Sequence, residues 1–360
     1  MKLLIQPGTG VKPLVEAIDG ARKSVEIAIF RFDRGEIEKA LVRAAERGVF
    51  VHALIAYTNR GGEKNLRQLE MRLLGQGVTV ARTSDELTRY HGKYVIVDRR
   101  ELFLLGFNFT YLDMEHSRSF GLALQTPEVV SEAARLFEAD AKRQHYEPKL
   151  ENFVVSPVNA RERLAAFIQE ARRELLIFDP KVGDPAMLRI LTERVDAGVD
   201  VKILGTLTRR ASVAARELSP MRLHTRTMVR DGESVFLGSQ SLRASELETR
   251  REVGLIFDDK KIADQIRGIF EDDWRQSESG RATSDEMLPL AKAARRVAKV
   301  VSRDLQSIAP VLEEAVRKVV GEGAHLDVQP EELEEAVKEA VKDAVESSVR
   351  DVVEAAVERR

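Results

Sequence analysis

An internal repeat is the strongest constraint on the fold of this 360-residue chain. A histidine, a cation two positions later and an aspartate five positions after that occur twice: His91, Lys93 and Asp98, then His224, Arg226 and Asp231. Upstream segments repeat at a larger offset, since ARKSVEIAIF at 21–30 matches ARRELLIFDP at 171–180, and RGVFVHALI at 47–55 matches AGVDVKILG at 197–205. The chain is therefore expected to form two similar units. The difference between the offsets indicates that the second unit is shorter, and the missing part corresponds to the region around Asn65 to Asp85.

Each unit alternates amphipathic helical stretches with short apolar strands. Val11 to Arg22 and Glu36 to Arg47 have helical patterns, and they lead into the apolar segments Val25 to Phe30 and Val49 to Ala56. Such alternation is typical of an α/β architecture in which helices cover a largely buried sheet. We therefore expect two duplicated α/β/α lobes packed together.

Composition divides the chain into three parts. The segment EPKL, within Tyr146 to Leu150, follows a polar helix and precedes the strand-like FVVS, so the lobes are expected to span 1–148 and 149–280. From Ser284 the sequence is rich in Ala, Val, Glu, Lys and Arg, which predicts a helical extension over 281–360 with helices at 285–320 and 330–358. A helical hairpin that docks on the lobes or mediates self-association is favoured. A membrane-surface helix and a disordered tail are the alternatives.

The repeated motif predicts paired strands that bring side chains together. Residues after each His are apolar or β-branched, as in a strand, so the His and the cation two positions later share one face. Asn108 and Ser241 follow the two motif histidines at the same interval, which fits a second strand returning beside the first. A histidine and cation used twice suggest two half-sites facing one reacting group.

These residues resemble the HxKxxxxD...GSxN signature of the phospholipase D superfamily, over about residues 1 to 280. The resemblance implies a phosphodiesterase with a single active site between two similar lobes. It also implies that one His attacks phosphorus to form a phosphohistidine while the other protonates the leaving oxygen. The Lys and Asn groups hold the non-bridging oxygens, and neither a metal nor another cofactor is required.

Carried over residue by residue, the resemblance assigns His91 as the nucleophile and His224 as the general acid. The groups implied to bind phosphate oxygens are Lys93, Asn108, Arg226 and Ser241, with Ser239 in a supporting position. Asp98 and Asp231 are expected to fix strand ends instead of taking part directly.

Several positions depart from the family pattern, among them Leu105 and Gly106, which stand where the family usually has Gly and Ser. Arg226 replaces a Lys, which exchanges a compact ammonium for a planar fork, and Ser241 replaces an Asn but keeps a hydroxyl. The family also tends to carry a Glu at a fixed interval after each His, which orients the imidazole. Glu252 stands at that position in the second copy, whereas Ser119 stands there in the first. The sequence therefore supplies no orienting carboxylate to His91.

The chemistry of a phosphodiester is consistent with this set of residue types. An anionic phosphorus centre needs cations and hydrogen-bond donors that stabilise charge in the transition state. Imidazole titrates near neutral pH, so a neutral His can attack while a protonated one donates to the departing alkoxide. Hydrolysis and transfer to another alcohol then share one intermediate.

Bulk composition adds only weak constraints. The chain has no Cys and a net charge of -2, and no apolar run long enough for a signal peptide or a membrane span, so a cytoplasmic protein is expected. A nuclease would need a basic track along the phosphate backbone. The candidate residues for it are Arg60, Lys64, Arg67, Arg209, Arg210, Arg216 and Arg222.

Three functions follow as hypotheses. The first is hydrolysis of phospholipids or transfer of phosphatidyl groups, with peripheral membrane contact; two-lobed single chains of the superfamily so often resemble phosphatidyl transferases that it is preferred by analogy. The second is a metal-independent DNA or RNA nuclease, suggested by GFNFT at 106–110, which resembles the motif of the family's small bacterial endonucleases. The third is a scaffold with a degenerate site, whose C-terminal helices are the functional surface and the candidate homo-oligomer contact.

Overall fold

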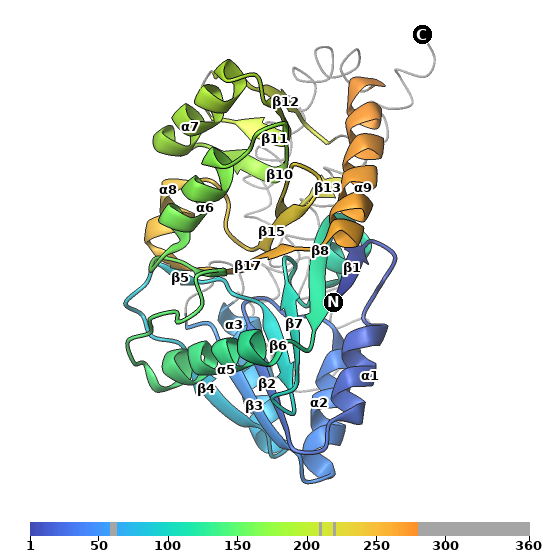
Figure 1. Ribbon diagram of the computed structural model, residues 1–360. Coiled ribbons are helices and arrows are strands. Elements are labelled where there is room, and N and C mark those ends of the chain that lie inside the picture. The colour runs from blue at the N-terminus through green and yellow to red at the C-terminus, as the bar shows by residue number, and fades with distance from the viewer. Residues whose placement is uncertain (58–62, 209–210, 219–220, 280–360) are drawn as a thin grey trace, which may run out of the picture. The chain divides into compact units, whose positions relative to one another are not determined.

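The computed structural model describes residues 1–57, 63–208, 211–218 and 221–279. Residues Met1–Glu278 form one compact unit. Figure 1 shows its first lobe in blue through teal to green and its second in yellow-green to orange. The helices predicted at 285–320 and 330–358 lie outside the described residues.

The two lobes contain sheets with the same strand order. The first runs β1 (Lys2–Gln6), β8 (Ser117–Leu124), β7 (Glu101–Leu105), β6 (Tyr94–Val97), β2 (Ser24–Ile29), β3 (Phe50–Ile55) and β4 (Thr79–Arg82). The second runs β9 (Phe153–Val155), β17 (Val253–Asp258), β15 (Ser234–Gly238), β14 (Arg226–Arg230), β10 (Glu174–Val182), β11 (Asp200–Leu207) and β12 (Ala214–Arg216). β6 is antiparallel to both of its neighbours, β2 and β7, and β14 is likewise antiparallel to β10 and β15. The β2–β3 and β10–β11 pairs are parallel. The predicted duplicated α/β architecture is confirmed.

Helices follow the strands as the periodicity predicts. In the first lobe they are α1 (Lys12–Gly20), α2 (Gly35–Glu46), α3 (Glu63–Gly75), α4 (Tyr111–Glu115) and α5 (Pro127–Lys142). In the second they are α6 (Ala160–Gln169), α7 (Pro185–Asp196), α8 (Ala244–Glu248) and α9 (Lys260–Ser279). Within the described residues between β11 and β14 there is no counterpart of α3. The shorter second repeat thus corresponds to the loss of this helix, which overlaps the predicted region around Asn65 to Asp85.

A shared apolar cluster joins the lobes. Phe120 of β8 meets Phe178 of β10 edge to face at 5.3 Å, and Phe178 meets Phe270 of α9 at 5.0 Å. All three side chains are at most 1% exposed. Buried aromatic pairs of this kind contribute both apolar area and a preferred geometry, so they fix the two sheets against each other.

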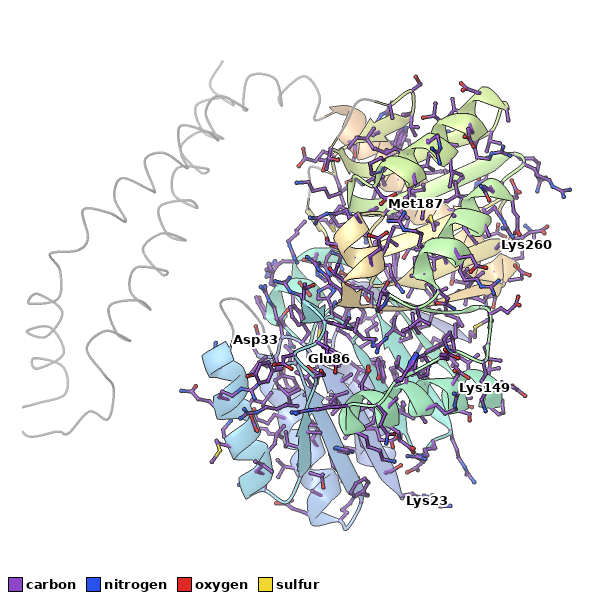
Figure 2. All side chains as sticks on the ribbon, turned by 90° about the vertical axis from the view of Figure 1, so that its left-hand side faces the viewer. Lys23, Asp33, Glu86, Lys149, Met187 and Lys260 are labelled. Carbon is purple, nitrogen blue, oxygen red and sulfur yellow. The ribbon has the colours of Figure 1, made fainter. Side chains whose placement is uncertain are left out.

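Two short strands cross between the lobes. β5 (Arg89–Tyr90) of the first pairs in parallel with β16 (Arg250–Arg251) of the second, and β13 (Arg222–Leu223) of the second pairs in parallel with β8 of the first. Each crossing strand ends immediately before a motif histidine. Figure 2 shows Lys23, just before β2, at the far end of the first lobe and Asp33, beyond β2, near the second lobe. The strand ends that carry the motifs therefore face the neighbouring lobe.

Among the described residues, no helix has both the length and the apolar character needed to cross a lipid bilayer.

Candidate active site

The crossing strands place each motif histidine beside the other lobe. Beyond β5, the register that pairs Arg250 with Arg89 continues so that His91 lies beside Glu252, and the His91 N–H donates to the Arg251 carbonyl at 2.7 Å. Beyond β13, the His224 N–H donates to the Arg118 carbonyl at 3.0 Å, which sets His224 beside the next residue of β8. Each motif histidine is thus positioned by a backbone hydrogen bond to the other lobe.

His91 is held from both ring nitrogens. Its Nδ1 lies 2.8 Å from Glu252 Oε2, and its Nε2 lies 2.9 Å from Lys93 Nζ. Because a carboxylate accepts and an ammonium only donates, this arrangement sets the proton on Nδ1 and leaves a lone pair on Nε2. The edge of the ring also packs on Phe30, with ring centroids 4.6 Å apart. Burial lowers the pKa of His91 well below its usual range, and the neighbouring charge of Lys93 lowers it further. These contacts and the lowered pKa favour the neutral Nδ1–H tautomer of His91.

The position of Glu252 corrects the sequence interpretation. Chain spacing associates Glu252 with His224 of its own repeat and leaves His91 without a carboxylate. The structure gives Glu252 to His91, because the parallel pairing of β5 with β16 runs between lobes. The glutamate is fully buried, and burial raises its pKa while Lys93 lowers it in part.

His224 lacks the matching carboxylate. The residue beside it in register is Ser119, and both the His224 Nδ1 atom and the Ser119 hydroxyl are buried without a hydrogen-bond partner among the described residues. Instead, His224 Nε2 lies 3.4 Å from Asp113 Oδ2. Burial lowers the pKa of His224 well below its usual range, and the charge of Asp113 opposes that effect. Asp113 is thus the carboxylate whose charge acts on the His224 ring.

Asp113 is itself held by three donors. Thr110 caps the short helix α4 by accepting from the Asp113 N–H, and Asp113 Oδ2 accepts from the Asn108 N–H at 2.8 Å and from Asn108 Nδ2 at 2.6 Å. Arg222 Nη1 donates to Oδ1 at 2.6 Å. Burial would raise the pKa of this carboxyl, but the charges of His224 and Arg222 and the Asn108 N–H lower it to about 2. Asp113 is therefore ionised at neutral pH.

The cations of both motifs converge. Lys93 is 1% exposed, and burial lowers its pKa to about 7, with the charge of Glu252 opposing the shift and that of Arg226 adding to it. Arg226 also lowers the pKa of His91. Its Nη1 donates to the His224 carbonyl at 2.5 Å. The Arg226 guanidinium therefore lies within electrostatic range of the opposite motif, as one shared site requires.

Comparisons with known proteins identify the family of this chain. A family model described as "Cardiolipin synthase, PLD-like domain" matches residues 14–141 and 164–274, which is more than half of the chain. The chain belongs to the phospholipase D superfamily. This chain is therefore related to the phosphodiesterases of that superfamily. A mitochondrial cardiolipin hydrolase from Danio rerio is 27% identical over 135 residues, which cover 36% of this chain and 58% of that protein. The match therefore spans little more than half of that relative's length.

Solved structures show the same fold. Polyphosphate kinase from Porphyromonas gingivalis aligns with a TM-score of 0.65 at 19% identity, over 76% of this chain and 50% of that one. Phosphatidylserine synthase from Haemophilus influenzae Rd KW20 aligns with a TM-score of 0.59 at 12% identity, over 77% of this chain and 86% of that one. At these identities the likeness concerns the phospholipase D fold alone.

Two of the predicted phosphate-binding residues donate elsewhere: the Asn108 side-chain amide donates to Asp113, and Ser241 is engaged within the second lobe. The Ser241 hydroxyl donates within a buried pair to Asp179 and lies 3.0 Å from the Lys181 carbonyl, and its N–H donates to Glu246 at 2.9 Å. Ser239 stays in a supporting place, where its hydroxyl accepts from the Val253 N–H at 3.1 Å. The second half-site therefore offers no free hydroxyl from Ser241.

The motif aspartates fix strand ends. Asp98 accepts backbone N–H groups from Arg22, Lys23 and Ser24, and Asp231 accepts from the equivalent residues of the second lobe. Both aspartates have left-handed backbone angles, with φ of 53° and 54°. Asp tolerates that conformation better than most residues. Their role is local structure at the sheet end away from the histidines.

The predicted basic track is divided. Arg222 reaches the site through Asp113, whereas Arg67 pairs with Glu70 at 2.7 Å and Arg216 stacks on Trp274 at 4.2 Å. The remaining side chains, those of Arg60, Lys64, Arg209 and Arg210, lie outside the described residues.

Sequence reasoning missed Asp113, Asp179 and Phe30. A signal for the first existed, because Asp113 and Glu246 each follow the Asn108 or Ser241 position by five residues. The repeat therefore extends one acidic position beyond the quoted motif. Phe30 and Asp179 have no equivalent signal, since they are ordinary residues at the ends of predicted strands.

Proposed function

We propose that this chain is a phosphodiesterase that works through a phosphohistidine at His91. The observation that supports it is the fixed state of that ring: Glu252 accepts the Nδ1 proton, and the Nε2 lone pair faces Lys93, where an anion would be held. A neutral imidazole with an unprotonated Nε2 is the form that can attack phosphorus, once Lys93 turns from this nitrogen to the substrate anion. A carboxylate on the opposite nitrogen makes that lone pair more basic.

The reaction then has two balanced steps. In the first, His91 Nε2 forms a bond to phosphorus, the bond from phosphorus to the leaving oxygen breaks, and protonated His224 gives that oxygen a proton. In the second, neutral His224 removes a proton from water, the water oxygen bonds to phosphorus, and the N–P bond breaks. Lys93 and Arg226 stabilise the negative charge in both transition states.

Asp113 acts as the positioning residue for His224. Because burial alone would keep His224 neutral, a nearby anion is needed to favour its protonated form. Asp113 Oδ2 at 3.4 Å from Nε2 supplies part of that charge; the pKa of His224 still lies below its usual range, so the bound anionic substrate must supply the rest. Its three donors hold the carboxylate in place, so the ring gains a defined partner although Ser119 replaces the expected Glu.

A phospholipid is the proposed substrate class. Tyr111 and Leu112 are 57% and 48% exposed and directly precede Asp113 on α4. Large apolar side chains exposed beside a site are suited to contact with a lipid surface. The description of the matching family model supports the same class.

The first experiment measures hydrolysis of bis(p-nitrophenyl) phosphate in EDTA. Wild type should turn over and His91→Ala should not, while His145→Ala, an exposed histidine paired with Glu147, should match wild type. Wild type quenched at alkaline pH should carry a p-nitrophenyl phosphoryl adduct by intact mass spectrometry, because only one of the two p-nitrophenolates leaves in the first step, and His91→Ala should carry none. Turnover that survives in His91→Ala would refute the assignment.

The substrate class is tested separately. Phospholipid in detergent micelles should be hydrolysed in EDTA, whereas single-stranded DNA and RNA should remain intact. Cleavage of nucleic acid without lipid hydrolysis would overturn the lipid proposal and leave the phosphohistidine proposal standing.

A further inference from the structure

Phe30 is the centre of a group of cations beside the nucleophile. The Cζ atoms of Arg31 and Arg89 lie 5.8 and 5.3 Å from its ring centroid, and Lys93 Nζ lies 5.7 Å from it. His91 packs its edge on the same ring at 4.6 Å. A single aromatic ring thus gathers three cations on the His91 side of the site. The attraction of each cation to the ring is modest, on the order of 0.5–2 kcal/mol.

The charges in this group are only partly balanced by carboxylates, because Glu252 and Glu246 act on Arg89 through space without pairing with it. Within the described part of the chain, Arg31 and Arg89 form no ion pair, although both contact Phe30. The neighbouring Arg250 is paired, with Glu246 Oε1 at 3.0 Å, and Glu252 is already engaged with His91. Burial lowers the pKa of Arg89, and the charges of Arg250 and Arg31 lower it further.

The internal repeat supplies a comparison for Arg89. Its equivalent in the second repeat, two positions before the motif histidine, is Arg222, which donates to Asp113 Oδ1 at 2.6 Å. The equivalent of Asp113 in the second repeat is Glu246, but Glu246 pairs with Arg250 and accepts the Ser241 N–H. Arg89 therefore occupies the position that in the other repeat holds a paired arginine, but it has no carboxylate partner among the described residues. A half-buried cation in this state favours an external anion.

We propose that Arg31 and Arg89 bind a second phosphate group of the substrate, next to the phosphodiester that His91 attacks. The inference deepens the proposed function and rests on it for the identity of the first phosphate. Planar guanidinium groups bind phosphate oxygens through paired N–H donors, and those of Arg31 and Arg89 lie 5.8 and 5.3 Å from the same Phe30 ring centroid. The ligand is thus a molecule with two phosphates joined by a short carbon bridge.

Binding is measured without requiring turnover. Calorimetric titration compares glycerol 1,3-bisphosphate with glycerol 1-phosphate, and thymidine 3′,5′-bisphosphate with thymidine 5′-monophosphate. Wild type should bind the bisphosphate of at least one pair about 10-fold more tightly, the size expected for one charged hydrogen-bonding contact. Arg31→Gln and Arg89→Gln, alone and together, should reduce that preference while binding of the monophosphates stays nearly unchanged.

Arg22→Gln is the matched control. Arg22 is an exposed arginine that precedes β2, whereas Arg31 follows it, so the substitution removes the same charge at the far end of the strand. The control should keep the wild-type preference, and Arg31→Gln, which changes an exposed side chain, guards against misfolding of the Arg89 variant.

The outcomes separate the two proposals. A wild type without any bisphosphate preference, or a preference that survives in the double variant, overturns the subsite. A preference lost in the double variant supports it, even if no phosphodiester is hydrolysed and the proposed function fails. The glycerol and thymidine pairs show whether the spacing matches a lipid or a nucleotide.

Discussion

Replacing Glu252 by Gln should slow formation of the phosphoenzyme specifically. The side chain is fully buried, and its Oε2 is 2.8 Å from His91 Nδ1. Gln keeps the size of the side chain but removes the charge. It also brings an amide donor that, facing Nδ1, favours the tautomer with its proton on Nε2. In that tautomer Nε2 has no lone pair with which to attack phosphorus, and its N–H points at the Lys93 ammonium, which is also a donor.

The magnitude follows from the kind of bond that is lost. A hydrogen bond to a charged group contributes about 1.5–3 kcal/mol, and each 1.36 kcal/mol is a factor of about ten in rate. The rate constant for phosphorylation of His91 should therefore fall about 10- to 100-fold. Glu248→Gln is the control, because Glu248 lies on the same segment but pairs with Arg161 at 2.6 Å.

The assay resolves the two steps. The pre-steady-state burst of p-nitrophenolate reports phosphorylation, and the steady-state rate reports dephosphorylation when that step is slower. Nitrogen-15 NMR of the ring should show a protonated Nδ1 in wild type and a mixture of tautomers in the variant. An unchanged burst rate together with slower dephosphorylation would refute the reasoning, because it would mean that Glu252 assists the step in which His224 activates water.

Other consequences of the structure can be measured with the same protein. His224→Ala should lose much more activity with an alkyl leaving group than with p-nitrophenolate, since only the alkoxide needs a proton; equal losses would remove its role as general acid. Because the pKa of Lys93 is about 7, sulfate affinity should weaken as pH rises above about 7, and Lys93→Met should bind sulfate with little pH dependence. Asp98→Ala should destabilise the fold by about 1–3 kcal/mol in urea titrations. Burial raises the Asp98 pKa, but three backbone N–H groups lower it overall, so the stabilisation is present above the unfolded pKa of about 3.9 and is lost as pH falls through the lower folded value. Ser241→Ala should leave activity nearly unchanged and destabilise the fold by about 1–3 kcal/mol, because Asp179 loses a buried donor; a large loss of activity would place Ser241 at the phosphate.

The duplicated fold is already visible in the order of residues along the chain. Helical and strand periodicities reflect backbone geometry within about ten residues, so they can be recognised without any partner segment. The equal spacing of the two motifs likewise indicates which residue types lie at the ends of equivalent strands. His91, Lys93, His224 and Arg226 could therefore be named from their order alone.

The partners of each histidine, by contrast, depend on how the lobes pack. Glu252 belongs by sequence to the repeat of His224, but it orients His91 because β5 and β16 pair between the lobes. His224 lies beside Asp113 for the same reason, whereas Ser241 donates to Asp179 through packing within the second lobe. These contacts join residues that are distant in the chain, so no local pattern reveals them. Spacing along the chain fixes the face on which a side chain lies, and packing of the lobes decides what stands opposite it.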